Sequence, residues 1–372
     1  MLTRLYINNF RCFVNFEYRP ERKQLILGAN GSGKSSCLDA LLLVRAFSTG
    51  AQNPESSVLL NHLWSQRTRW LTLEQQTFEI DAALASQSYS YRLAVMPDGE
   101  RRTPLVSSES VHVDGKPIFS FTNGQVQLFD DDLQPTVAYP FDKTRSALAT
   151  IVYQKDNLKL IRFKSWLTAL QGFRINPFSM TARAENEAFH PSLNLSNFAA
   201  WYRHLIQTLP RVNQGFVQSL SETLDGFTFL QLDAAGEDVR LLAAEFSMAG
   251  GGSCSFRFQE LSEGQKCLIC LYAILHFVVA NDFPVVIDEP ENFISLREIQ
   301  PWLTAASEMI DEGKGQLILI SHHPEIMNQW APDFGVNFSR EGNGPVRVSR
   351  FSGDPESCLS PAELIARGWE GE

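Results

Sequence analysis

Short apolar segments open the chain and predict a few strands followed by a helix. Apolar side chains recur over residues 2–7, 14–18 and 24–27, and each segment has the length of a typical strand. The run Ser35–Phe47 is instead rich in Leu and Ala, which favours a helix. The third strand should therefore lead through a glycine-rich loop into a helix.

The middle of the chain changes its pattern twice. From Trp70 to Tyr139 apolar and polar residues alternate, and Asp114-Gly115 and Asn123-Gly124 offer hairpin turns, so we expect an antiparallel meander. Residues 145–222 have mostly helical spacing, interrupted by prolines. Strand patterns return between Phe227 and Phe258.

Helical and strand-like segments alternate in the C-terminal part. We expect a helix from Leu261, an apolar strand at 283–287, a helix at 296–311, an apolar strand at 316–320 and a short helix after Pro324. Such alternation is typical of a parallel sheet.

A glycine-rich loop follows the third predicted strand and fits the pattern G-x-x-x-x-G-K-S in full, from Gly28 to Ser35. Glycines let the backbone fold tightly, so that N–H groups and a helix N-terminus face phosphates. A lysine in this position neutralises β/γ-phosphate charge, and the following hydroxyl binds Mg²⁺. We predict an ATP and Mg²⁺ site whose loop ligands are Asn30, Gly31, Ser32, Gly33, Lys34, Ser35 and Ser36.

These patterns together predict an α/β fold of the P-loop NTPase type. It would have a parallel core sheet, an antiparallel β-meander and a helical insertion. We expect residues 1–145 to form the N-terminal part of the domain, residues 146–225 the helical insertion and residues 226–372 the C-terminal part.

Two carboxylates end the apolar strand before residue 290. Asp288 would hold Mg²⁺ through water, and Glu289 would polarise the water that attacks the phosphate. A surface pair of acids is the alternative for this sequence alone. The glycine-rich loop upstream favours the catalytic interpretation.

The segment Leu261–Gln265 (LSEGQ) stands at the start of a predicted helix. Ser262 would cap that helix, whose N-terminus would then face an anion. Ser262 and Gln265 also satisfy the S-x-x-Q pattern of a capping box, which is the structural alternative. Gly264 in the first turn is costly for a helix and favours the anion-binding interpretation.

A histidine pair follows the next apolar strand. A side chain there lies at the edge of an open α/β sheet where ligands bind, so it would contact the γ-phosphate. We prefer His322 to His323 because it directly follows Ser321. A structural or solvent-exposed histidine pair remains the alternative.

In this order the four motifs resemble the ABC-type ATPase heads, and within them the SMC, RecF and OLD group. Residues 7–13 (INNFRCF) are similar to the opening segment of that group. The resemblance implies that two copies sandwich two ATP molecules, each held by Lys34 and Ser35 of one copy and by Ser262 and Gly264 of the other. It also implies that Glu289 is the catalytic base, that His322 is the switch histidine and that residues 290–292 begin the loop connecting the two sites.

The sequence departs from that group at two points. Glu263 replaces the usual glycine of the LSxGQ signature, and an acid there could weaken the sandwich. The residue of the glutamine loop that the resemblance implies is not evident, and Gln134 and Gln154 are both candidates. No heptad pattern is long enough for a coiled-coil arm.

Composition narrows the choice of partners. The net charge is −10, which argues against a protein that coats nucleic acid by its overall charge, although a local basic patch stays open. Lys155, Lys159, Arg162 and Lys164 form a modest basic run that we interpret as a solvated helix face.

The six cysteines do not suggest disulfides. Cys267 and Cys270 form a C-x-x-C inside an apolar helical run, so we expect buried thiols rather than a zinc or redox site. The N-terminus does not resemble a signal peptide, and the apolar run 267–275 is too short to span a bilayer. We expect a cytoplasmic protein without membrane contact.

The motifs favour an ATPase that closes as a homodimer or higher homo-oligomer and reopens on hydrolysis. Its output would pass to DNA or to a separate effector, a nuclease or a toxin, as the resemblance to prokaryotic DNA-maintenance and anti-phage ATPases implies. Two alternatives remain. One is an ATP-gated scaffold with little turnover, and the other is the ATPase subunit of an ABC transporter.

Overall fold

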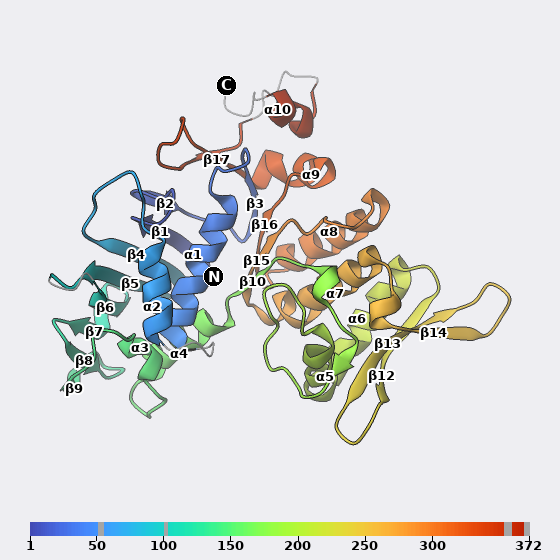
Figure 1. Ribbon diagram of the computed structural model, residues 1–372, viewed down its shortest axis with the longest axis horizontal. Coiled ribbons are helices and arrows are strands. Elements are labelled where there is room, and N and C mark those ends of the chain that lie inside the picture. The colour runs from blue at the N-terminus through green and yellow to red at the C-terminus, as the bar shows by residue number, and fades with distance from the viewer. Residues whose placement is uncertain (51–55, 100–102, 353–358, 368–372) are drawn as a thin grey trace. The chain divides into compact units, whose positions relative to one another are not determined.

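The structure is a computed structural model, and it describes residues 1–50, 56–99, 103–352 and 359–367 (Figure 1). Cys358 lies outside these residues. The chain forms two compact units. Unit 1 comprises Met1–Gln171 and Phe334–Asp354, and unit 2 comprises Gly172–Asp333 and Pro355–Trp369, apart from three terminal residues grouped with unit 1.

An eight-stranded antiparallel sheet dominates unit 1, with the order β2-β1-β4-β5-β6-β7-β8-β9. Tight turns at Asp114-Gly115 and Asn123-Gly124 join β6 to β7 and β7 to β8, with positive φ at all four residues, which confirms the predicted meander. The strands are β1 (Leu2–Asn8), β2 (Phe16–Tyr18), β4 (Gln76–Leu84), β5 (Gln87–Pro97), β6 (Pro104–Val113), β7 (Lys116–Thr122), β8 (Gln125–Phe129) and β9 (Pro135–Pro140).

Helices of unit 1 bury apolar side chains against this sheet and against one another. Phe163 stacks at 5.9 Å on the rings of both Tyr89 and Tyr91, which fixes α4 on the meander. Arg45 is buried in α1 and donates twice to the carbonyl oxygen of Thr168 near the end of α4. The helices are α1 (Lys34–Thr49), α2 (Ser56–Ser65), α3 (Ala147–Thr150) and α4 (Leu158–Ala169); the sequence pattern did not predict α2.

Unit 1 also contains three further strands, one of which leads into the glycine-rich loop. β3 (Lys23–Leu27) is buried along its whole length and runs parallel to β17 (Gly335–Ser339), which also pairs antiparallel with β18 (Arg347–Arg350). β3 and β17 are separated in sequence by most of the chain, yet Leu25 pairs with Gly335.

Unit 2 contains the predicted parallel strands. β15 (Pro284–Asp288) runs parallel to β16 (Gln316–Ile320), and both are fully buried. In this register Asp288 stands opposite Ile320, so both strands end at the same edge. The helices of this region are α7 (Glu263–Phe277), η3 (Val279–Asn281), α8 (Leu296–Asp311), α9 (Pro324–Phe334) and α10 (Pro361–Arg367).

The remainder of unit 2 is a small antiparallel sheet with two helices. The sheet has the order β11-β13-β12, with β14 also paired to β13. Phe198, Trp201 and Tyr202 of α5 are buried and belong to the core. The elements are β11 (Arg183–Ala184), β12 (Phe227–Ala234), β13 (Arg240–Ser247), β14 (Ser253–Arg257), η2 (Phe258–Glu260), α5 (Phe198–Thr208) and α6 (Pro210–Thr223).

Residues 171–197 interrupt the mostly helical segment, and the prolines that break its sequence pattern lie within them. They hold β10 (Gln171–Phe173), η1 (Pro177–Ser179), β11 and turns, with no α-helix. Pro177 and Pro191 lack an N–H and disfavour α conformation in the residue before them, so the helical pattern cannot continue through this stretch.

One stretch, Glu263–Asn281, meets a length and hydropathy criterion for crossing a membrane, with a mean hydropathy of 1.4. It joins α7 and η3 and is longer than the apolar run recognised in the sequence. A core helix meets the same criterion, and 72% of this stretch is buried within the protein, so it is weak evidence for a membrane span.

Candidate functional site

Left-handed backbone at three glycines shapes the loop between β3 and α1. The angle φ is 136° at Gly28, 80° at Gly31 and 103° at Gly33, where a side chain would be strained. A Cβ atom on Gly28 would lie 2.2 Å from the carbonyl oxygen of Phe338 and 2.8 Å from Ser32 Oγ. Glycine therefore allows the loop to pack directly on the backbone of β17.

The first turn of α1 offers an anion-binding position. The N-cap, Gly33, has no side chain to occupy the N–H groups at the helix start, and no acidic residue lies in the first turn. Lys34 Nζ donates to the carbonyl oxygens of Gly28 (2.6 Å) and Ala29 (3.1 Å), which folds the ammonium group over the loop.

The hydroxyl groups of Ser32 and Ser35 are relevant to whether a nucleotide fits this loop. Ser32 Oγ is buried and has no hydrogen-bond partner among the described residues. Ser35, Asn30 and Gly31 are exposed. An orphaned hydroxyl, uncapped N–H groups and a lysine together suit a triphosphate, and an exposed hydroxyl at Ser35 suits Mg²⁺, so the residues present fit both groups.

The segment after β1 supports the loop from its other side. Arg11 Nη1 donates to Ser36 Oγ (3.2 Å) and to the carboxylate of Asp39, so Ser36 already has a partner within the protein. Asn9 is buried with φ of 62°, and its amide bonds three backbone groups of residues 68–75. The segment that resembles the opening of the SMC/RecF group therefore orders α1 and the loop before β4.

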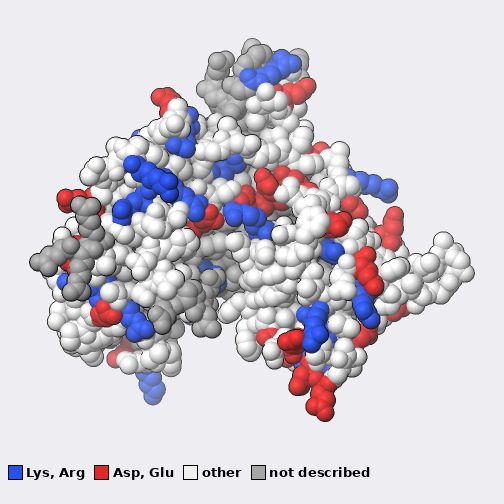
Figure 2. All heavy atoms as spheres, in the orientation of Figure 1, with Lys and Arg blue, Asp and Glu red and all other residues white. Residues whose placement is uncertain are grey.

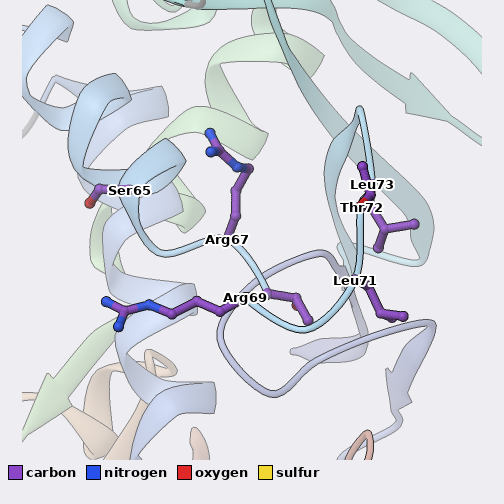
Figure 3. Close-up of a pocket in the computed structure, with 7 residues that line it drawn as sticks. Ser65, Arg67, Arg69, Leu71, Thr72 and Leu73 are labelled. Atoms are coloured by element: carbon purple, nitrogen blue, oxygen red, sulfur yellow. The ribbon is translucent and has the colours of Figure 1, made fainter.

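The loop between α2 and β4 lines a cavity of about 400 Å³ that no sequence motif indicates (Figure 3). Arg67 and Arg69 line it together with Leu71 and Leu73, and in Figure 3 the arginine side chains extend away from the leucines. Arg67 lies 3.8 Å from the ring centroid of Trp64, and its Nη1 atom is buried without a hydrogen-bond partner among the described residues. Burial lowers the pKa of Arg67 from its ordinary value.

In unit 2 the carboxylate predicted to hold Mg²⁺ is paired with an arginine. Asp288 is buried, and its Oδ2 atom accepts hydrogen bonds from Nε (3.0 Å) and Nη2 (2.9 Å) of Arg174. The guanidinium group compensates the buried negative charge where a divalent cation would do so. No sequence signal indicates this pair, because its members are far apart and Arg174 belongs to no motif.

Glu289 directly follows the last residue of β15 and is exposed. Its φ of 53° is left-handed, which is uncommon for a residue with a side chain and recurs at functional sites. Its N–H donates to the carbonyl oxygen of Ile320 (2.8 Å), and its Oε2 atom accepts from Asn292 Nδ2 (2.7 Å). The backbone at Glu289 is therefore fixed to the end of β16, and its carboxylate is accessible.

The LSEGQ segment forms the N-terminus of α7. Ser262 Oγ accepts from the N–H of Gln265 (3.2 Å), and the Gln265 side chain accepts from the N–H of Ser262 (3.1 Å), so the capping box is present. A Cβ atom on Gly264 would lie 2.7 Å from the carbonyl oxygen of Phe293. This close approach is a structural reason for Gly264 that the sequence pattern does not reveal, and the anion-binding role stays a prediction.

The two histidines after β16 differ in their surroundings. His323 Nδ1 accepts from the N–H of Glu325 (3.3 Å) and so serves the start of α9. His322 is exposed, and its N–H donates to Glu291 Oε1 (3.2 Å). This division of roles favours His322 as the histidine that would contact a phosphate.

The two candidates for the glutamine ligand make local contacts. Gln134 Nε2 donates to the carbonyl oxygen of Asp132 before β9, and the N–H of Gln154 donates to Asn157 Oδ1, and neither contact involves the P-loop. Cys267 and Cys270 are buried in α7, and burial raises the pKa of Cys267 to about 12, as expected for inert thiols. No cluster of three or more His, Cys, Asp or Glu side chains suited to a metal occurs in the described ranges.

Comparison with known proteins decides the family. A family profile described as "AAA domain, putative AbiEii toxin, Type IV TA system" matches residues 25–328, from β3 into α9. The chain belongs to this family. No curated protein matches the chain in sequence.

Solved structures similar to this chain are Smc head domains. A SmcHead bound to the C-winged helix domain of ScpA has a TM-score of 0.56 at 14% identity, covering 94% of this chain and 97% of that one. A Smc head with a coiled coil and joint from Pyrococcus yayanosii has 0.54 at 12%, covering 99% of both chains. A Smc head with an extended coiled coil from Pyrococcus furiosus has 0.51 at 14%, covering 98% of both. At such identities the similarity establishes the fold, that of an ABC/SMC-type P-loop ATPase head, and confirms the predicted fold class.

Proposed function

We propose that this protein binds Mg²⁺-ATP at the loop between β3 and α1 and hydrolyses it. The observation that carries the proposal is the loop itself. Its three left-handed glycines, the uncapped start of α1 and the orphaned Ser32 hydroxyl surround a position that suits phosphate oxygens.

The chain supplies residues for each task of phosphoryl transfer. Lys34 neutralises phosphate charge and Ser35 would hold Mg²⁺, together with Asp288, which Arg174 would release. The metal supplies charge neutralisation when it is bound. Glu289 has an exposed carboxylate on a rigid backbone, which suits it to orient and deprotonate the attacking water, and His322 would contact the γ-phosphate.

We further propose that two copies complete the nucleotide site. Ser262 and Gly264 would reach the ATP of the other copy through the N-terminus of α7, whose first-turn N–H groups favour an anion. Glu263 also lies in that turn and carries a negative charge. It would slow the closing of the dimer rather than prevent it.

The output of the cycle is proposed to reach DNA or a separate protein effector, in the cytoplasm. One similar structure is a head bound to a domain of ScpA, which supports a surface for a second protein on this fold. Lys and Arg side chains gather in one group on the upper left of the visible face of unit 1 (Figure 2). The cavity lined by Arg67 and Arg69 offers a local site for phosphate groups despite the net charge of −10. A role in anti-phage defence or DNA repair rests on the family and on the resemblance.

The test is steady-state ATP hydrolysis by the wild type and Glu289→Gln, with Glu308→Gln as the control on an exposed acid of α8. We expect Glu289→Gln to lower kcat at least about 100-fold while retaining ATP binding, and to accumulate an ATP-dependent dimer by light scattering. Equal turnover by wild type and Glu289→Gln would refute the catalytic assignment. DNA binding is tested separately by duplex affinity at two salt concentrations for the wild type and the Arg67→Ala, Arg69→Ala double variant.

An ATP-gated scaffold with little turnover is the second candidate. The Arg174–Asp288 pair favours it, because the metal-binding carboxylate is already compensated by a positive charge. A wild type that dimerises with ATP but turns over no faster than Glu289→Gln would identify this function.

A further inference from the structure

Glu291 connects the loop after β15 to the end of β16 through one carboxylate oxygen. Its Oε1 atom accepts from Ser321 Oγ at 2.7 Å and from the N–H of His322 at 3.2 Å. Glu291 lies three residues after Asp288, the last residue of β15, in a turn between β15 and α8. Its carboxylate therefore binds the residue proposed to contact the phosphate and the residue before it.

The environment of this carboxylate is unusual for a loop residue. The Oε2 atom is buried and has no hydrogen-bond partner in the part of the chain that the structure describes. Burial raises the pKa of Glu291. A half-buried carboxyl group with an unsatisfied oxygen costs stability, so an apolar or amide residue would serve better if packing alone were required.

Ser321 connects Glu291 to the segment that contains His322 and His323. Its buried hydroxyl donates to Glu291 and accepts from the N–H of His323 at 3.0 Å. His323 in turn accepts from the N–H of Glu325. The backbone on both sides of His322 is thus fixed by hydrogen bonds that lead back to Glu291, while the His322 side chain stays exposed.

The same loop also fixes the proposed base. The N–H of Glu289 donates to the carbonyl oxygen of Ile320, and the N–H of Ile294 donates to the carbonyl oxygen of Glu291. Asn292 of this loop donates from its N–H to the carbonyl oxygen of Glu289 (3.3 Å) and from Nδ2 to the Glu289 carboxylate (2.7 Å). One short segment therefore sets the direction of both Glu289 and His322.

We propose that Glu291 is a positioning residue that aligns His322 with Glu289 for hydrolysis. The inference rests on the proposed ATPase function, because it assigns a role in that reaction. Glu291 touches neither nucleotide nor water in this role; it acts through the backbone of His322 and the hydroxyl of Ser321.

The experiment compares Glu291→Ala, Glu291→Gln and the control Glu308→Ala in the full chain. An amide oxygen in Glu291→Gln can still accept from Ser321 and His322, whereas Glu291→Ala removes the acceptor. We expect kcat to fall on the order of 10- to 100-fold in Glu291→Ala, with KM and the Kd for a fluorescent ATP analogue within about twofold of the wild type. Glu291→Gln should recover most of kcat.

A role in folding alone would give a different result. A fall in thermal stability and ATP affinity that matches the loss of kcat, with no recovery by Glu291→Gln, would overturn the proposal, as would unchanged kcat in Glu291→Ala. If Glu291→Ala does not fold, Ser321→Ala removes the donor instead and must lower kcat with unchanged ATP affinity.

A measurement without turnover separates this inference from the proposed function. In protein labelled with ¹⁵N-histidine, the backbone amide resonance of His322 should shift in Glu291→Ala and return toward the wild-type position in Glu291→Gln. If the wild type hydrolyses no ATP, the proposed function fails while this resonance still reports on alignment. An unchanged His322 resonance in Glu291→Ala would refute the positioning role by itself.

Discussion

Arg174 donates two hydrogen bonds to a single carboxylate oxygen of Asp288, from Nε at 3.0 Å and from Nη2 at 2.9 Å. The side chain of Asp288 is 6% exposed and that of Arg174 is 43% exposed. The guanidinium group therefore compensates a buried negative charge on the side chain that we propose as a Mg²⁺ ligand.

Arg174→Ala should destabilise the nucleotide-free protein by about 1–3 kcal/mol, because Asp288 would then be buried without a positive partner. Mg²⁺-ATP should narrow this difference, since the metal would supply the missing charge. Thermal unfolding with and without Mg²⁺-ATP measures both effects. The control is Arg183→Ala, which breaks an exposed pair with Glu185 and should cost less than about 1 kcal/mol. An equal loss with and without Mg²⁺-ATP would mean that Arg174 and the metal do not share Asp288.

Gly28→Ala should be more damaging than Gly31→Ala. Both positions have positive φ, but a Cβ atom on Gly28 would meet the backbone oxygen of Phe338, whereas none of the described atoms lies within 4 Å of a Cβ on Gly31. We expect a cost of at least about 2 kcal/mol for Gly28→Ala and about 1–2 kcal/mol for Gly31→Ala. Urea unfolding measures the difference, and equal costs would show that the loop does not depend on its contact with β17.

Glu109→Gln should change how stability depends on pH. Glu109 is fully buried in β6 and accepts from Tyr91, from Ser146 and from two N–H groups at the start of α3, yet burial raises the pKa of its carboxyl group above 4.5. The folded protein then takes up a proton at a pH where the unfolded chain is still ionised. Lowering the pH from 7 toward 4.5 should therefore stabilise the wild type relative to Glu109→Gln.

Urea unfolding between pH 7 and pH 4.5 measures whether the stability difference between the wild type and Glu109→Gln changes in this direction. Glu17→Gln is the control, because hydrogen bonding to Arg4 lowers the pKa of Glu17. Relative to this variant the wild type should lose stability as the pH falls below 4.5, which is the opposite direction. If the difference in the free energy of unfolding between the wild type and Glu109→Gln does not change with pH, Glu109 keeps an ordinary pKa.

Local patterns predict most of the elements because each depends on nearby residues. Alternation and Xaa-Gly turns predict the meander, and short buried runs predict β3, β15 and β16. Residues 171–197 do not yield to such patterns, because prolines and turns there follow no period. The α2 helix is missed as well, and the residues directly before it, 51–55, lie outside the described part of the chain.

Contacts between distant segments limit the prediction of the site. The P-loop residues are contiguous, so their sequence predicts their arrangement. The contacts of Arg174 with Asp288 and of Glu291 with Ser321 join segments that are distant in sequence, so they depend on the tertiary fold around β15 and β16. Lys164 illustrates the same limit. Its place in a basic run predicts a solvated face, yet its Nζ atom donates to the carbonyl oxygens of Ala149 and Ile151 at 2.7 Å and so fixes the end of α3.

The pairing of β3 with β17 has a consequence for biosynthesis. Gln24 bonds the carbonyl oxygen of Phe334, a partner 310 positions later, and Gly28 packs on Phe338 in the strand that follows. During translation, Gly172–Asp333, the main part of unit 2, leaves the ribosome as one continuous segment and can fold while later residues are still being added. The glycine-rich loop of unit 1 instead packs on β17, which is synthesised after that segment. The glycine-rich loop therefore cannot adopt this conformation until β17 has been synthesised.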